Sequence, residues 1–405
     1  MVNDVVGGGV ERVAYINASE LSKRDDYIIG MVTCGKRPDF VKPDNHFILR
    51  DFRKKSKIRG VFGFLFNFRA MLDCLYNFKP CIIHIHAYIQ FSPGALKALL
   101  VYKSKNKCVV IYTHHTFSYI CPNDALFNYR KGCKCIKCIN GKYYHILFDI
   151  CYGTFFPSIG KFIQKRMYRQ IFVKNLIDVH LTPSNFVKEM LLRSEPYLKI
   201  QVIYNPCIDK IINHIPYKKP GKIVCFGRIS REKNFSTIIR IIQNFLKELN
   251  LTIIGSGPDS DILLKQIHKN SPFVTMSNIE FINKFITHDE LQSQISDAQL
   301  FILPSLTYET SGLSIVEAIN LGITPLVSNW GGMKETVDIL GVGYVFNPYD
   351  DESIIKAIKL ALEYRLQDEA KILEKAKHNL KIYTYNTYML NICLIYEKSL
   401  KEILA

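Results

Sequence analysis

Short apolar runs typical of β-strands alternate with helix-like segments along nearly all of the 405 residues. Residues 234–249 and 289–298, for example, carry apolar side chains at helical spacing. Consecutive parallel strands need a crossover of a dozen or more residues, usually a helix, so the alternation predicts parallel sheets covered by helices. The predicted strands are 27–33, 81–86, 109–113, 179–183, 200–204, 223–226, 251–254, 279–282, 300–303 and 324–327.

The predicted fold class is α/β with two Rossmann-like domains facing each other across a cleft. A stretch with three prolines near residues 205–221 marks the boundary, and strands resume after it. We expect an N-terminal domain over 1–205, with a Cys-rich insert at 115–151, and a C-terminal domain over 206–385. Residues 386–405 are predicted to form a helix that packs back on the N-terminal domain. Ligands of such sheets bind at the carboxyl ends of the strands.

Charge is distributed unevenly. Residues 1–215 hold 32 Lys/Arg against 15 Asp/Glu, a net charge of +17, whereas residues 216–405 hold 21 of each. A basic half suits nucleic acid, an anionic membrane surface or phosphorylated substrates. The chain shows no nucleic-acid-binding motif, no secretory signal and no clean apolar run of about 20 residues. We therefore expect a soluble cytoplasmic protein that binds no nucleic acid.

Two segments of the C-terminal half carry residues suited to a phosphorylated sugar ligand. In the first, a strand ends near Pro304, a loop holds Glu309, and Gly312 opens a helix that holds Glu317. Free N–H groups at a helix start suit phosphate, and carboxylates accept hydrogen bonds from paired sugar hydroxyls. In the second, Arg228 and Lys233 follow a strand, and together they offer a guanidinium fork and a point charge to a diphosphate. No catalytic metal is then required.

These segments, in this order, resemble glycosyltransferase family 4, the large retaining family with the GT-B fold. An N-terminal Gly-Gly-x-Glu-Arg motif is matched by Gly8, Gly9, Glu11 and Arg12, and a Gly-Arg pair by Gly227 and Arg228. A Gly-x-Gly-Pro motif after a strand is matched by Gly255, Gly257 and Pro258, and a histidine after the strand of residues 109–113 by His115. The sequence departs from the family at Thr310 and Ser311, where Gly-Phe is usual, and at Asn283, where Gly is common.

The resemblance implies a role for each matching residue. Arg228 and Lys233 would neutralise the donor diphosphate, and Glu309 would contact the transferred sugar. Glu317 would hold the nucleotide ribose, and His115 would face the donor sugar. The remaining donor contacts would come from backbone at glycine-rich turns and a helix start: Gly9, Gly227, Gly312 and Leu313.

The activity implied is transfer, with retention, of a hexose-type sugar from a nucleotide-diphosphate donor to a glycan or polyprenyl-linked acceptor. Bacterial capsule, O-antigen or exopolysaccharide synthesis is the expected setting. Two alternatives remain open, a nucleotide-sugar epimerase on the same fold and a non-catalytic subunit that binds a nucleotide sugar or glycan. Detection of sugar transfer would distinguish a transferase from the epimerase. The presence of all four charged residues, Arg228, Lys233, Glu309 and Glu317, argues against a non-catalytic subunit.

Five cysteines fall within residues 121–151, and Cys135 and Cys138 have the spacing of a zinc knuckle. With Cys121 and Cys151 they form a candidate structural zinc site, and the alternative is a set of reduced thiols. The other cysteines are predicted to be small core residues: Cys34, Cys74, Cys81, Cys108, Cys207, Cys225 and Cys393. His84 and His86 are expected to be structural, and Asp259 and Asp261 to open a helix rather than bind a metal.

Basic and aromatic residues alternate over 53–69 and 161–174, which fits a surface in contact with anionic lipid. The alternative is two ordinary amphipathic helices packed on the sheet. The charge excess favours a peripheral position on the inner face of the cytoplasmic membrane.

The start of the chain is unusual for a Rossmann-like domain. Such a domain opens with a strand, but only residues 1–6 precede the glycines, and Asn3 and Asp4 interrupt even these. A central strand is normally a continuous apolar run. We therefore expect a short or absent middle strand in the N-terminal sheet, and a start placed too late along the gene.

Overall fold

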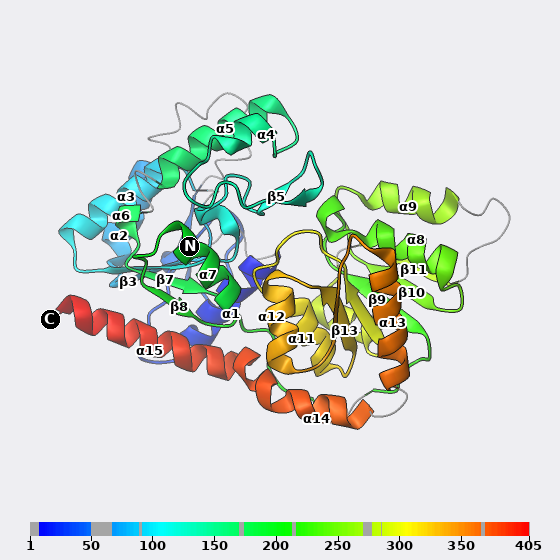
Figure 1. Cartoon of the computed structure of the whole chain (residues 1–405). Coiled ribbons are helices and arrows are strands. Elements are labelled where there is room, and N and C mark those ends of the chain that lie inside the picture. The colour runs from blue at the N-terminus through cyan, green and yellow to red at the C-terminus, as the bar shows by residue number, and fades with distance from the viewer. Residues whose placement is uncertain are drawn as a thin grey trace. The chain divides into compact units, whose positions relative to one another are not determined.

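The computed structural model describes residues 8–49, 67–88, 91–169, 174–212, 216–269, 278–284, 286–365 and 369–404. The chain divides into two compact units, shown in Figure 1. Unit 1 comprises residues 1–131, 135–206 and 385–405, and unit 2 comprises residues 132–134 and 207–384.

Parallel pairing dominates unit 1. β3, β4, β7 and β8 form a four-stranded sheet in that order, and β1 pairs with β2 in a separate two-stranded sheet. β4 is buried along its whole length, so it lies at the centre of the core. The strands are β1 (Met31–Thr33), β2 (His46–Ile48), β3 (Ile82–Ile85), β4 (Val109–Thr113), β5 (Phe127–Asn128), β6 (Cys133–Lys134), β7 (Val179–Thr182) and β8 (Ile200–Val202).

Local sequence signals explain several helix starts in unit 1. The Ser92 hydroxyl accepts a hydrogen bond from the Ala95 amide at the start of one helix, with Pro93 in the first turn, and the Ser184 hydroxyl caps the helix that begins at Asn185 in the same way through Val187. The helices are α1 (Gly9–Ser22), α2 (Phe68–Phe78), α3 (Pro93–Lys105), α4 (His145–Asp149), α5 (Phe155–Met167), α6 (Lys174–Leu176), α7 (Asn185–Ser194) and α15 (Tyr385–Leu404), with 3-10 turns η1 (Pro43–Asn45) and η3 (Phe117–Tyr119).

Unit 2 holds one parallel six-stranded sheet in the order β11-β10-β9-β12-β13-β14. Its strands are β9 (Lys222–Phe226), β10 (Asn250–Ile254), β11 (Ile279–Ile282), β12 (Leu300–Leu303), β13 (Thr324–Ser328) and β14 (Tyr344–Phe346). Its helices are α8 (Phe235–Phe245), α9 (Ser260–Lys269), α10 (His288–Ile295), α11 (Leu313–Asn320), α12 (Gly331–Leu340), α13 (Asp351–Arg365) and α14 (Glu369–Leu380), with η5 (Arg231–Lys233) and η6 (Lys381–Tyr383).

β9 is the first strand of the unit 2 sheet along the chain, and the later strands lie on both sides of it. Apolar residues of α8, α9 and α13 form one core with the strands, in which Ile238, Leu263 and Ile354 meet Ile223 and Ile253. Right-handed crossovers then place α11 and α12 on the other face (Figure 1). The strand order reverses between β9 and β12, which is the position where sheets of this kind bind their ligands.

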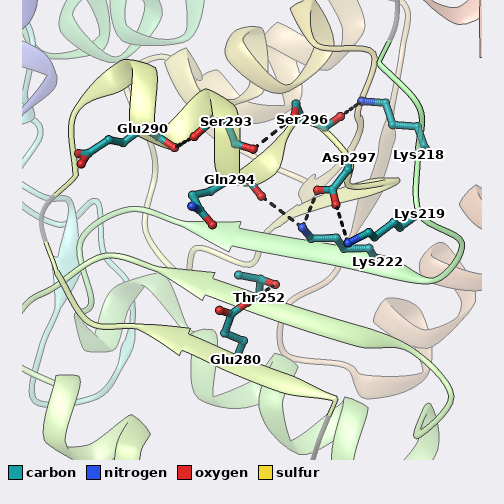
Figure 2. A network of polar contacts seen from close by, with 10 residues as sticks. All are labelled: Lys218, Lys219, Lys222, Thr252, Glu280, Glu290, Ser293, Gln294, Ser296 and Asp297. Atoms are coloured by element: carbon teal, nitrogen blue, oxygen red, sulfur yellow. Dashed lines mark hydrogen bonds and ion pairs between the residues drawn. The ribbon is translucent and has the colours of Figure 1, made fainter.

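A network of lysines fixes the start of unit 2 to the opposite, amino-terminal edge of the sheet (Figure 2). Buried Lys218 donates from Nζ to the carbonyls of Ser296 and Leu321, at 2.5 and 2.7 Å. These carbonyls lie at the ends of α10 and α11, where the helix dipoles favour a cation. Lys222 and Lys219 both pair with Asp297, at 2.5 and 3.4 Å.

The predicted strands correspond to observed ones, but four observed strands were not predicted: β2, β14 and the short pair β5 and β6. The first predicted strand is shortened to three residues, and residues 1–7 lie outside the described part of the chain. The prediction that Asp259 and Asp261 open a helix is confirmed by α9, which has Asp261 in its first turn. Cys81 was predicted to be a core residue, and this is wrong, because it is exposed just before β3.

Candidate active site

The candidate site of unit 2 lies where the loops after β9 and β12 meet at the carboxyl edge of the sheet. The two strands are neighbours, with Leu300 opposite Ile223, so both loops emerge beside the topological switch point. They are tied together by backbone, since the Leu306 amide donates to the Glu232 carbonyl at 2.7 Å. The Ser305 hydroxyl donates to the same carbonyl at 3.3 Å.

An ion pair connects the two loops. Lys233 Nζ lies 2.6 Å from Glu309 Oε1, and both side chains are about one-fifth exposed, at 22% and 21%. Ser305 Oγ donates to the same carboxylate oxygen at 2.8 Å. The pair therefore remains accessible to solvent while its geometry is held from two sides, which is suitable for a group that must exchange partners with a ligand.

Glycines after β9 and β10 let the two loops approach each other closely. A Cβ added to Gly255 would lie 1.9 Å from the Gly227 carbonyl oxygen, and one added to Gly257 would lie 2.1 Å from that of Ile229. The backbone is paired across this contact, with Gly227 N to Ile254 O and Ile229 N to Ser256 O both at 3.0 Å. This packing places the exposed side chain of Arg228 at the carboxyl edge.

α11 begins at Gly312, as the sequence predicts, and Glu317 lies in its second turn, 7% exposed. A Cβ on Gly312 would lie 2.6 Å from Ile315 Cδ1, so a larger residue at this helix start would require the Ile315 side chain to move. Leu313 follows as the first helical residue, with a partly exposed side chain.

The Glu309 loop is also supported from α12. The Gly332 amide donates to the Glu309 carbonyl at 2.8 Å, and Trp330 Nε1 donates to the Thr307 carbonyl at 3.1 Å. A Cβ on Gly332 would lie 2.7 Å from the Thr310 backbone. Sequence reasoning did not assign a role to these residues or to Ser305. The signals present were a polar residue directly after a buried strand and a Gly-Gly pair at a helix start.

His115 lies just after β4, in a cluster of histidines at the carboxyl ends of β3 and β4. His86 Nδ1 and His115 Nε2 share a hydrogen bond of 3.0 Å, and His84 contacts Thr113 Oγ1 at 2.7 Å and Tyr396 OH at 2.6 Å. Burial lowers the pKa of His115 to about 3. His115 is therefore neutral near pH 7 and acts there as a hydrogen-bonding group, not as a cation.

Gly9 is the first residue of α1, and the Gly8 carbonyl accepts from the Arg12 amide at 3.2 Å. Gly8 and Gly9 are both exposed, and the Glu11 and Arg12 side chains are half-buried. The structure thus places Gly9 and His115 in unit 1 and the other candidate residues in unit 2.

The four cysteines of the candidate zinc site lie in the insert of unit 1, with Cys121, Cys138 and Cys151 buried and Cys135 half-buried. Asn123 lies among them, since its Oδ1 accepts from Cys121 at 2.8 Å and its Nδ2 donates to Cys151 at 3.6 Å. Burial raises the pKa of the Cys121 thiol to about 11 and of the Cys151 thiol to about 12.

No group of three or more His, Cys, Asp or Glu among the described residues is placed to hold a metal ion. Zinc binding therefore stays a prediction, which metal analysis of the purified protein tests.

The fold of both units is that of GT-B glycosyltransferases. A glycosyltransferase from Rickettsia africae superposes with a TM-score of 0.69 at 17% identity, over 99% of this chain and 97% of that one. HepE of Anabaena, solved in complex with UDP, superposes with a TM-score of 0.65 at 15% identity, over 98% and 99%. At these identities the likeness shows the fold alone.

The sequence assigns the family within that fold. The model described as Glycosyltransferase Family 4 matches residues 7–208, and the model described as Glycosyl transferases group 1 matches residues 209–379. The two matches are contiguous, so the chain belongs to glycosyltransferase family 4, as the motifs predicted.

Among curated proteins, a glycogen synthase of Caldicellulosiruptor bescii is 31% identical over 194 residues, 40% of this chain and 39% of that protein. CapJ of Staphylococcus aureus is 30% identical over 171 residues, 42% of this chain and 40% of that protein. These alignments thus span about two fifths of the length of each relative.

Proposed function

We propose that this protein transfers a sugar from a nucleotide-diphosphate donor bound at the carboxyl edge of the unit 2 sheet. The observation that carries the proposal is the Lys233–Glu309 ion pair, held between the loops after β9 and β12 at the switch point. A diphosphate entering this site would take Lys233 as its counter-ion and leave Glu309 free to bind a sugar hydroxyl. Support comes from HepE of Anabaena, which was solved with UDP and with UDP-glucose.

In this proposal the residues stabilise charge and hold the sugar in position. Arg228 and Lys233 offset the negative charge that grows on the leaving diphosphate, which in a water-excluded site is a large part of catalysis. Glu309 binds the transferred sugar at the reacting centre, and Glu317 binds the ribose. Gly227, Gly312 and Leu313 provide backbone contacts to the donor, and Gly9 and His115 keep the donor-contact roles that the family resemblance implies.

Transfer of a hexose with retention to a glycan or polyprenyl-linked acceptor is the finer part of the proposal. A role in bacterial surface polysaccharide synthesis belongs to the same finer part.

A panel of nucleotide sugars tests the activity. We expect one donor to release nucleoside diphosphate in the presence of a glycan or polyprenyl-phosphate acceptor, with a product whose anomeric configuration matches the donor. Epimerised donor without transfer would support the epimerase instead. Binding of a donor without either product would support a non-catalytic subunit.

We also propose that unit 1 contacts an anionic membrane surface from the cytoplasmic side. No helix in the described part of the chain is long and apolar enough to cross a membrane. Of the two segments predicted to touch lipid, residues 53–66 and 170–173 lie outside the described residues, and α5 carries most of the second.

The support is an aromatic patch formed by Tyr144, Phe148, Tyr152, Phe155 and Phe156, all exposed, on α4, at the start of α5 and between them. The two helices lie against each other (Figure 1). Phe148 and Phe156 are 78% and 81% exposed, an unusual state for large apolar side chains. Exposed basic residues accompany the patch: Arg130, Lys131, Lys137, Lys142 and Arg166.

Changing Phe148 and Phe156 together to alanine should abolish sedimentation with anionic vesicles, because each phenylalanine removed from water contributes up to about 1.5–3 kcal/mol. Changing Leu390 and Leu394, which are 65% and 63% exposed on α15, provides the matched control. High salt should release the unchanged protein, since exposed charges are screened. Equal binding to neutral vesicles, or loss of binding in the leucine variant, would contradict the proposal.

A further inference from the structure

Unit 2 includes a short segment from an earlier part of the chain, residues 132–134, to which the proposed donor site gives no role. Lys134 of this segment is half-buried, and its Nζ lies 3.3 Å from the centre of the Trp330 ring and 5.4 Å from that of the Tyr308 ring. The face of an aromatic ring attracts a cation. The ammonium group is therefore held at a defined place in this unit.

Backbone contacts fix the same segment. The Tyr349 hydroxyl donates to the Gly132 carbonyl at 3.5 Å, and the Tyr349 ring lies 5.8 Å from the Trp330 ring. A Cβ on Gly132 would lie 3.1 Å from a guanidinium nitrogen of Arg231, so the segment passes close to the loop after β9. The position of Lys134 thus results from contacts of the whole segment and not from its side chain alone.

The two rings around Lys134 belong to the part of unit 2 that carries Glu309. Tyr308 directly precedes Glu309 in the chain. Trp330, which precedes α12, donates from Nε1 to the Thr307 carbonyl at 3.1 Å and so supports the same loop. A ligand of Lys134 would therefore lie next to the loop whose carboxylate is proposed to bind the transferred sugar.

The ammonium group of Lys134 differs from those of neighbouring lysines in its surroundings. Lys233 pairs with Glu309, and Lys334 pairs with Asp338. In the described part of the chain, the groups recorded around Lys134 Nζ are the two rings. Burial lowers the pKa of Lys134, so a charged partner would stabilise its ammonium form. An ammonium group has three N–H donors, which suit the oxygens of an anion such as phosphate.

We propose that Lys134 binds a phosphate group of the sugar acceptor. This inference rests on the proposed function, in which Arg228 and Lys233 offset the charge of the donor diphosphate. A further cation beside the Glu309 loop suits an acceptor that carries phosphate of its own, close to the hydroxyl that receives the sugar. The acceptor is then a sugar linked to a phosphate or diphosphate, as on a polyprenyl carrier, and not a neutral glycan.

Binding of farnesyl diphosphate tests the inference, with a nucleoside diphosphate present at saturation to fill the donor site. Lys134→Met keeps the length of the side chain but removes its charge. We expect this variant to bind farnesyl diphosphate roughly tenfold or more weakly, because it loses a charge-assisted hydrogen bond. Its affinity for the nucleoside diphosphate should equal that of the unchanged protein, and Lys134→Arg should recover part of the loss. Isothermal titration measures both affinities.

Lys334→Met is the matched control, since it removes a lysine one helical turn after Trp330 that already has a carboxylate partner. It should bind both ligands like the unchanged protein. Equal affinity of Lys134→Met and the unchanged protein for farnesyl diphosphate would overturn the proposal. Weaker binding of the nucleoside diphosphate by Lys134→Met would also overturn it, because the phosphate bound by Lys134 would then be that of the donor.

Trp330 provides a second readout, because it is the single tryptophan of the chain. A phosphate that draws the ammonium group away from the ring should change the emission of Trp330 in the unchanged protein, but not in Lys134→Met. Farnesol, which has the same hydrocarbon chain without phosphate, should produce no change, and an equal response to farnesol would contradict the proposal. Neither readout needs turnover, so a failure here leaves the donor site and sugar transfer intact, and the reverse also holds.

Discussion

Changing Lys233 to alanine is expected to lower kcat/KM for sugar transfer roughly 10- to 150-fold, because a hydrogen bond to a charged group is worth about 1.5–3 kcal/mol. Donor affinity should fall by a similar factor, since the diphosphate loses its counter-ion. Glu309 retains its hydrogen bond from Ser305, so the loop after β12 keeps its support. Isothermal titration with the donor and initial-rate kinetics measure the two effects.

Lys219→Ala is the matched control for this change. It also removes a lysine that pairs with a carboxylate, Asp297, but at the amino-terminal edge of the same sheet. Its kinetics should equal those of the unchanged protein. Lys233→Arg should recover part of the activity, because it restores the charge but not the point-like ammonium. Unchanged kinetics in Lys233→Ala would remove this residue from the donor site.

Acid is expected to destabilise unit 1 steeply. Burial lowers the pKa of His115 to about 3 and of His180 to about 4, and it also lowers the pKa of His84, His86 and His114. The native state holds these imidazoles neutral, whereas the unfolded chain takes up protons below about pH 6.5. The free energy of unfolding is therefore highest above pH 6.5, and it falls as the pH drops from there toward 3.

At pH 5, the low pKa values of His115 and His180 should each lower the free energy of unfolding by about 2 kcal/mol relative to pH 7. Together the two histidines lower it by about 4 kcal/mol. Unfolding by urea at the two pH values measures the loss. His180→Gln should reduce the pH dependence of stability, while the same change at exposed His378 should leave it unaltered. A pH dependence that is identical in both variants would contradict the assignment.

The sequence by itself determined the fold class, and it singled out the residues of the C-terminal half that we propose as the donor site. Both depend on local patterns. Apolar runs alternate with amphipathic segments because each strand and each crossover helix must bury its own apolar face. Gly227 follows such a pattern, because it adopts a φ of +136°, which few residues other than glycine can adopt.

The departures from prediction have physical reasons of their own. Cys81 is a small apolar residue beside a strand, and local pattern does not distinguish such a residue at an exposed strand entrance from one in the core. β2 and β14 have only three residues each, too few to show a periodicity.

Only the tertiary structure decided which side chains meet. Lys233 and Glu309 are 76 residues apart, and their contact exists because β9 and β12 are neighbours in a sheet whose order differs from the order along the chain. His84 and Tyr396 are 312 residues apart in the sequence, and they too are brought into contact by the packing of elements within one unit. Side-chain spacing along the chain reports one element at a time, whereas the pairing of elements depends on the packing of the whole unit.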